Sequence, residues 1–220
     1  MSVRERHQRE RAARREAILS AAARVFAIHG LDGATIEMIA REAEVAVGTI
    51  YLYFCSRDEL FLTLMVDRIS ELRDRYREIQ AQGLAPIDEL RTMARAYIDY
   101  LSSSRGLFVA QLSVAFSKLP ARFARAEELD RYRALSEVGR EGFQLWRESV
   151  ARVFAHDAAV MATMMWATLN GSFLLSGDDD FFRDLTGQDP TSLLAGVFDF
   201  QLDALVGRRP DNRSGVRSIE

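Results

Sequence analysis

Apolar side chains recur every three or four residues along most of the chain, which is the spacing that places them on one face of an α-helix. In the first clear segment, Ile18, Ala22, Val25 and Phe26 share such a face. This segment is expected to end at Gly30, because glycine readily terminates a helix in the left-handed conformation. A convincing strand pattern is missing from the sequence. The periodicity therefore predicts an all-α protein.

Two short helices are expected next, and a long one after them. The first covers about residues 36–43 with Thr35 as its N-cap, and the second covers about residues 46–53. Ser56 and Glu59 have the spacing of a capping box, in which the serine hydroxyl and the glutamate carboxylate accept each other's backbone N–H groups. The box is expected to begin an amphipathic helix of about five turns.

The rest of the chain is also expected to be helical. Pro86 suits the first position of a helix, and Asp189 is placed to cap the last one. The expected helices lie over about residues 86–104, 107–118, 121–155, 157–176 and 190–206. They bring the total to about nine, and the polar residues 207–220 are expected to form a frayed tail.

One stretch, residues 158–177, has no charged side chain and is long enough to raise the hypothesis of a membrane span. The run contains hydroxyl and amide side chains, and acidic residues flank it directly, so no cationic side sets an orientation. A helix that is apolar nearly all round can equally be buried in a protein. We expect a buried or subunit-interface helix and no membrane partner.

Basic side chains are concentrated at one end of a chain whose formal net charge is −3. Residues 1–24 carry seven arginines against three glutamates, whereas the remainder carries 22 basic and 29 acidic residues. This asymmetry suggests that one end meets a polyanion, although a solvated arm that only aids solubility is the alternative. The first residues lack the apolar core of a secretory signal, so a cytoplasmic protein is expected.

Cysteine and histidine are too scarce for several kinds of chemistry. Cys55 is the single cysteine, which excludes an internal disulfide and a cysteine-based metal cluster. A redox role for Cys55 is conceivable, but packing is the expectation. The three histidines, His7, His29 and His156, lie at unrelated places and supply no nucleophile–base pair. We therefore expect no enzyme activity, no cofactor and no bound metal.

Residues 35–54 have the layout of a helix-turn-helix, with a tight turn at Glu44 and Val45. In such a unit the second helix protrudes, so that its first residues can enter the major groove of DNA. The residues at its start are small, and Ile50 and Phe54 are placed to anchor it inward. Ordinary packed helix pairs show similar patterns, and the spacing alone leaves both interpretations open.

The run from Thr35 to Leu60 resembles the helix-turn-helix of the TetR (tetracycline-repressor) family of bacterial transcription regulators. The matching positions are Thr35, Ile39, Ala40, Ala43, Val45, Gly48, Thr49, Ile50, Tyr51, Tyr53, Phe54, Ser56, Asp58, Glu59 and Leu60, with Ile18, Ala22, Phe26 and Gly30 upstream. The detailed match covers residues 14–60, about a fifth of the chain. Two positions depart from the family pattern: Glu44 stands where a turn glycine is usual, and Ala46 where a serine cap is common.

The resemblance implies roles for individual residues. DNA contacts are expected from Thr35, Ala46, Val47, Gly48, Thr49, Tyr51, Tyr53 and Arg57. Arg11, Arg14 and Arg15 are expected to supplement them from the basic arm, through phosphates or the minor groove. The resemblance also implies a second helical domain that dimerises and holds a small-molecule effector.

The expected organisation is an arm and DNA-binding domain over residues 1–56, an effector and dimerisation domain over 57–206, and the tail. The helices over 157–176 and 190–206 are expected to form a four-helix bundle with their symmetry mates. The effector cavity is expected to be lined by aromatic, methionine and amide side chains, although such residues can equally form ordinary core. These residues are Tyr97, Tyr100, Phe108, Gln111, Phe116, Trp146, Met165, Trp166 and Asn170.

The sequence thus predicts a ligand-responsive repressor. It would bind a palindromic operator in double-stranded DNA as a homodimer, and an apolar or aromatic small molecule would release it. The competing interpretation is a helical small-molecule or lipid-binding protein whose helix-turn-helix is not used for sequence-specific DNA binding.

Overall fold

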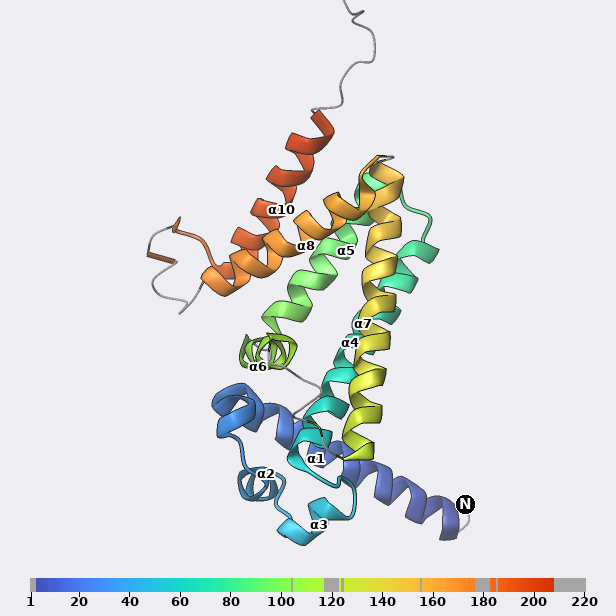
Figure 1. The fold of residues 1–220 in the computed structure, drawn as a ribbon, viewed down its shortest axis with the longest axis vertical. Coiled ribbons are helices and arrows are strands. Elements are labelled where there is room, and N and C mark those ends of the chain that lie inside the picture. Colours follow the sequence, from blue (N-terminus) through green and yellow to red (C-terminus); the bar gives the residue numbers. More distant parts are fainter. Residues whose placement is uncertain are drawn as a thin grey trace, which may run out of the picture.

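A computed structural model describes residues 3–103, 105–116, 123, 125–154, 156–176, 183–184 and 186–207, and every regular element within them is helical (Figure 1). The helices are α1 (Val3–Gly33), α2 (Ile36–Glu42), α3 (Val47–Tyr51), α4 (Arg57–Ala81), α5 (Pro86–Ser102), α6 (Arg105–Phe116), α7 (Ala126–Val153), α8 (Ala158–Leu175) and α10 (Pro190–Gly207). The predicted all-α class is therefore confirmed. The expected tail lies, apart from Gly207, outside the described residues.

Two of the predicted N-caps are present. Thr35 Oγ1 accepts a hydrogen bond of 3.2 Å from the N–H of Met38 at the start of α2. Asp189 Oδ1 accepts one of 3.0 Å from the N–H of Ser192 at the start of α10. Each satisfies a backbone donor that the first helical turn leaves without an intrahelical partner.

The predicted capping box at α4 is half right. Ser56 Oγ accepts from the N–H of Glu59 at 3.0 Å, as predicted. The Glu59 carboxylate, however, accepts from the N–H of Cys55 at 2.6 Å and not from that of Ser56. The glutamate therefore also fixes the residue that precedes the cap, which holds the short connection between α3 and α4.

Helix α1 differs from its prediction at both ends. It begins at Val3, so the basic segment expected to be an arm is helical. Gly30 has φ 66° and ψ −178°, and this positive φ bends the helix, which continues to Gly33. Gly30 therefore kinks the helix where termination was expected, because the following residues still form a helical turn.

Buried side chains form two clusters. Helices α2 and α3 of the first cluster and helices α8 and α10 of the second lie toward opposite ends of the long axis (Figure 1). The first cluster combines α1, α2, α3 and residues 60–65 of α4 with Leu107 and Ala110 of α6 and with Phe123. The second combines the remainder of α4 with α5, α7, α8, α10 and Phe108 of α6. Helix α7 packs along α4 over much of its length (Figure 1). The predicted boundary at residue 56 thus precedes a helix that takes part in both cores.

Helix α6 connects the two regions by a close crossing with α1. A Cβ atom built on Gly106 would lie 1.8 Å from the carbonyl oxygen of Ala27, far inside any real contact. Only glycine permits this approach. The first turn of α6 therefore rests directly on the backbone of α1.

Candidate DNA-binding site and effector cavity

Helix α3 lies at one end of the molecule, at the edge of the first core (Figure 1). Ile50 and Phe54 are buried and anchor it, as predicted. Tyr51 points the other way and is 54% exposed. All the predicted contact residues retain access to solvent, namely Thr35, Ala46, Val47, Gly48, Thr49, Tyr51, Tyr53 and Arg57. The structure therefore presents the start of α3 at the surface.

The turn before α3 has the two local weaknesses that its sequence suggests. Glu44 adopts the left-handed conformation with φ 54°, which costs a residue other than glycine about 1–2 kcal/mol. Ala46 is the N-cap of α3 and makes no side-chain hydrogen bond to it, whereas a capping side chain typically contributes about 1 kcal/mol. Burial of Ile50, more than local hydrogen bonding, therefore holds this five-residue helix in place.

The basic half of α1 packs over the end of the helix-turn-helix. The guanidinium of Arg11 lies 5.8 Å from the ring centroid of Tyr53, and that of Arg15 lies 5.4 Å from the ring centroid of Phe54. Such cation–π contacts contribute about 0.5–1 kcal/mol each at exposed sites. Arg14 is exposed on the same helix. The arginines predicted to act from an arm are thus held beside the candidate DNA-binding surface.

Arg57 has contacts within the protein. Its Nη1 donates to the carbonyl oxygen of Ala34 at 3.0 Å, and its Nη2 donates to Asp58 Oδ1 at 3.0 Å. The side chain thereby ties the start of α4 to the residue before the cap of α2. Its contact with DNA phosphate stays a prediction.

A second set of polar contacts joins the start of α7 to the connection between α3 and α4. Ser56 Oγ donates to Glu128 Oε1 at 2.6 Å, and the N–H of Arg125 donates to Glu128 Oε2 at 3.2 Å. The Arg125 guanidinium donates to the carbonyl oxygen of Cys55. Glu128 is only 6% exposed. We call these four residues the hinge clasp, because they fix the cap of α4 to α7.

The surroundings of Cys55 disfavour a reactive thiolate. Partial burial, together with a hydrogen bond to the carboxylate of Glu59, raises the pKa of the Cys55 thiol. Reactive cysteines need a lowered pKa. This supports packing over redox sensing at this position.

A cavity of about 130 Å³ lies in the second region, between α4, α5, α6, α7 and α8. Five of the predicted effector residues line it, namely Tyr97, Tyr100, Gln111, Trp146 and Trp166. Phe108, Met165 and Asn170 are instead buried in the core around it. The side chain of Phe116 lies outside the described residues.

Sequence reasoning missed the walls that α4 and the middle of α7 provide. These residues are Ile69, Leu72, Arg73, Tyr76, Gly139, Gly142 and Phe143. The prediction drew its candidates only from residues beyond the long helix. The apolar seam of α4, which includes Leu72 and Tyr76, was the signal that could have found this wall.

Two phenols of α5 are paired with amides beside the cavity. Tyr97 Oη donates to Asn170 Oδ1 at 2.9 Å, and Tyr100 Oη donates to Gln111 Oε1 at 2.6 Å. Burial raises the pKa of Tyr100 to about 12, and it also raises the pKa of Tyr97. Both hydroxyls therefore stay protonated and act as donors at neutral pH.

The uncharged helix α8 has two different faces. Ala162, Met165, Leu169 and Phe173 are buried, whereas Val160, Met164, Leu174 and Leu175 are exposed. By length and composition α8 could cross a membrane, and 28% of it is buried inside the protein. Helix α10 lies beside it (Figure 1), and Phe200 of α10 is 78% exposed. An apolar surface therefore remains uncovered over these two helices.

The short helix α3, anchored by its inner face and open at its start, stands on a three-helix unit beside a row of arginines. This arrangement is that of a helix-turn-helix, the unit whose second helix enters the major groove in proteins that bind DNA.

Comparison with known proteins agrees with a helix-turn-helix at this end of the molecule. Residues 18–64 match the family of "Bacterial regulatory proteins, tetR family". The chain is 29% identical over 129 residues to the fatty acid metabolism regulator protein of Bacillus subtilis, covering 58% of this chain and 66% of that protein. It is 40% identical over 97 residues to the HTH-type transcriptional regulator HbdR of Aromatoleum sp., covering 42% of this chain and 40% of HbdR. Both alignments span less than two thirds of the relatives' own length.

Solved structures extend the likeness to the whole fold. FadR of Bacillus subtilis, in a crystal structure with stearoyl-CoA, has a TM-score of 0.66 at 19% identity, over 85% of this chain and 97% of that one. The chain therefore resembles TetR-family regulators over residues 18–64 and shares its overall fold with this solved structure. Members of this family bind DNA operators and small-molecule effectors.

Proposed function

We propose that this protein is a cytoplasmic, dimeric repressor that binds a palindromic operator and releases it when an apolar or aromatic small molecule occupies the cavity. The observation that carries the proposal is the exposed start of α3, held from below by Ile50 and Phe54. The start of α4 lies in the same core as this surface, and the later turns of α4 line the cavity.

The surface of α3 suits contact with duplex DNA. Ala46 and Gly48 are exposed and small, so the backbone can come close to base edges and phosphates. The Thr49 hydroxyl can bond a base edge or phosphate, and the exposed phenol of Tyr51 can bond a phosphate. The arginines on α1 add positive charge next to this surface.

A second copy of the chain would cover the apolar surface of α8 and α10. Pairing these helices about a two-fold axis gives a four-helix bundle, which buries the exposed side chains of both subunits. The two α3 helices could then enter successive major grooves, about 34 Å apart along the DNA. Such a dimer reads a palindrome.

The effector would act by changing the relative placement of the two α3 helices. Helices α4 and α7 both line the cavity, and the hinge clasp joins them again at the start of α4. A ligand that moves either helix therefore moves the base of the helix-turn-helix. A hundredfold loss of operator affinity needs only about 2.7 kcal/mol of differential ligand binding, which is within the usual range of coupling energies.

The experiment first selects operator fragments from a random DNA pool with the purified protein. The affinity for the selected fragment is then measured at increasing salt concentrations. If the arginines and α3 neutralise DNA phosphates, the logarithm of the binding constant should fall with the logarithm of the salt concentration. The expected slope is about −0.9 per phosphate contacted. A slope near zero would refute the proposal. Failure to select any sequence while the cavity still binds small molecules would favour the helical small-molecule-binding alternative.

Two variants test the contact surface on the selected operator. Thr49→Ala and Tyr51→Phe each remove one hydroxyl and are expected to weaken binding roughly three- to tenfold, the usual worth of one hydrogen bond. Tyr132→Phe on α7 removes the same atom from a phenol outside the candidate surface and serves as the matched control. Unchanged affinity in both α3 variants would show that the exposed face is not the reading surface.

A further inference from the structure

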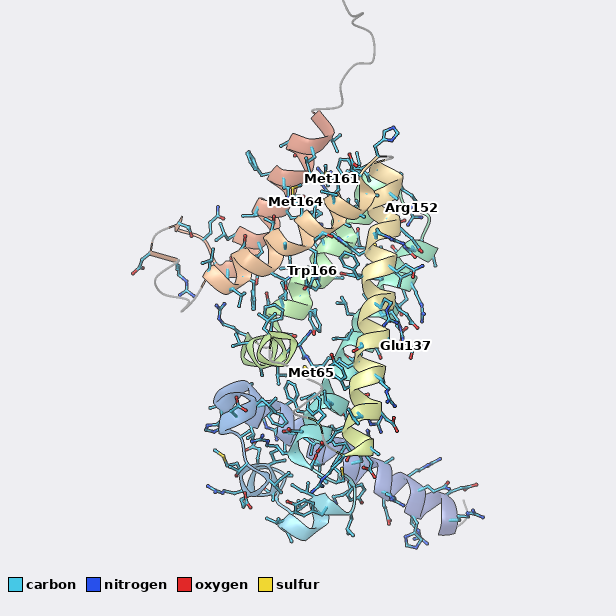
Figure 2. All side chains as sticks on the ribbon, in the orientation of Figure 1. Met65, Glu137, Arg152, Met161, Met164 and Trp166 are labelled. Carbon is cyan, nitrogen blue, oxygen red and sulfur yellow. The ribbon has the colours of Figure 1, made fainter. Side chains whose placement is uncertain are left out.

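The effector cavity is enclosed by three pairs of aromatic rings from four different helices. Tyr76 and Trp146 are stacked at 6.4 Å between ring centroids, and Tyr97 and Tyr100 are stacked at 6.0 Å. Phe143 and Trp166 meet edge to face at 6.1 Å, with Trp166 extending from α8 toward α7 (Figure 2). Aromatic rings prefer such offset or edge-to-face neighbours at about 4.5–7 Å, so a further ring placed among them would be accommodated favourably.

One wall of the cavity carries no side chain. Gly139 and Gly142 of α7 both line it, and a Cβ atom built on Gly139 would have no neighbour within 4 Å. A flat molecule can therefore approach the backbone of α7 at this wall. The aliphatic lining is limited to Ile69 and Leu72.

The hydroxyl of Tyr76 is the unusual group in this cavity. Tyr76 is only 4% exposed, and among the described residues its hydroxyl has no hydrogen-bond partner, whereas Tyr97 and Tyr100 each bond an amide. Tyr76 lines the cavity, and among the described residues its oxygen is not one of the fully buried side-chain atoms that lack a partner. Burial raises the pKa of Tyr76, so the hydroxyl remains a donor. Buried polar groups are nearly always satisfied, which makes a ligand atom the natural partner.

The charges around the cavity favour a neutral ligand. Among the described residues, Arg73 is the one ionised side chain that lines it. Its Nη2 lies 2.9 Å from Asp74 Oδ1 and its Nη1 lies 3.2 Å from Glu141 Oε2. Arg77 shares both carboxylates, so this cluster of two arginines and two acids is balanced. An anionic ligand would therefore find no uncompensated cation and would lose its hydration.

We propose that the cavity binds a neutral, ring-bearing molecule with a hydrogen-bond acceptor oxygen, and that the Tyr76 hydroxyl donates to this oxygen. The inference rests on the proposed function, whose effector class it names. The cavity of about 130 Å³ suits one small ring system, since drug-sized ligands need about 300–1,000 Å³. A long acyl chain would meet mainly aromatic walls and would exceed this space.

Intrinsic fluorescence of the full-length protein tests the proposal directly, because both tryptophans of the chain line the cavity. The probes are phenol, toluene, benzoate and decanoyl-CoA. Phenol and toluene are expected to change the emission saturably, with phenol the tighter ligand. Benzoate and decanoyl-CoA are expected to leave it unchanged. Saturable binding of decanoyl-CoA without binding of phenol or toluene would overturn the proposal.

Tyr76→Phe removes only the oxygen and isolates its role. It is expected to weaken phenol binding roughly three- to tenfold and to leave toluene binding unchanged, because toluene has no acceptor. Tyr132→Phe is the matched control and should alter neither affinity. Equal weakening of phenol and toluene in Tyr76→Phe would show a merely structural role and refute the assignment.

Operator binding, measured separately on the selected fragment, keeps the two proposals distinct. Loss of phenol binding with intact operator binding would refute the ligand assignment alone. Loss of selective operator binding with intact phenol binding would refute the repressor function alone.

Discussion

The two cores of this protein are built in different ways. The core below α3 is formed mainly by residues between Ile18 and Met65, which are near one another in the chain, and its largest members are apolar. The core around the cavity brings together residues of six helices that are far apart in the chain, and it leaves a space of about 130 Å³ among its rings. A reading surface needs one fixed shape, which close packing provides. A sensor needs unfilled space and donors that a ligand can satisfy.

The largest effect on stability is expected from disrupting two similar pairs of phenylalanine rings, one in each core. Phe26 meets Phe61 edge to face at 5.1 Å, and Phe108 meets Phe173 in the same way at 5.3 Å. Phe26→Ala and Phe108→Ala should each lower the free energy of unfolding by about 3–5 kcal/mol in urea denaturation. Where both variants are still folded, only Phe26→Ala should impair operator binding without ligand. Equal loss of operator affinity in both variants would contradict the assignment of operator binding to the first core.

The next effect concerns the crossing that connects the cores. Gly106→Ala would push a methyl group into the carbonyl of Ala27, so α6 must move away from α1. We expect a loss of about 1–3 kcal/mol in the free energy of unfolding, by analogy with overpacked cores. Gly139→Ala makes the same change in α7, where a Cβ has room, and should stabilise by about 0.5–1 kcal/mol through helix propensity. Equal stability of the two variants would show that α6 does not rest on α1.

A smaller effect is expected at the hinge clasp. Ser56→Ala should cost about 1 kcal/mol through loss of the α4 cap. Ser56→Asp keeps a capping oxygen but cannot donate to Glu128. It therefore tests the contribution of the clasp while the cap of α4 is retained. A double-mutant cycle between Ser56→Ala and Glu128→Ala, followed by urea denaturation, should give a coupling of about 1 kcal/mol.

Ser136→Ala is the matched control, because that hydroxyl donates within α7, to the carbonyl oxygen of Tyr132. Additive effects of the two clasp variants would show that α7 and the cap of α4 are energetically independent.

The smallest effect is a pH dependence of stability that arises at Tyr76 in the cavity region. Burial raises the pKa of Tyr76 in the folded state above its usual value of 10.0. Stability from this phenol is therefore complete below pH 10 and falls as the pH rises above it, because the unfolded chain then loses its proton more readily. Relative to Tyr76→Phe, the wild type should lose less than about 1 kcal/mol at pH 10.5. Parallel pH profiles of the two proteins in chemical denaturation would contradict the burial of this hydroxyl.

Local sequence determined most of the helices, and the family resemblance pointed to α3 as the proposed reading helix. Helical hydrogen bonds join residues four apart, and caps act within one turn, so Thr35, Ser56 and Asp189 could be assigned without knowledge of the fold. The departures at Glu44 and Ala46 were also local: Glu44 is left-handed, and Ala46 caps α3 without a side-chain hydrogen bond. Gly30 was misjudged because a positive φ can bend a helix as well as end it.

Only the tertiary structure decided which apolar positions enclose a cavity and which fill a core. Tyr76 and Ile79 belong to one seam of α4, yet Ile79 is fully buried in the core while Tyr76 lines the cavity. Periodicity states that a side chain points inward, but not whether another side chain meets it there. That depends on α5, α7 and α8, whose contacts with α4 join residues far apart in the chain. For the same reason the clasp between Ser56 and Glu128, 72 positions apart, had no signature in the sequence.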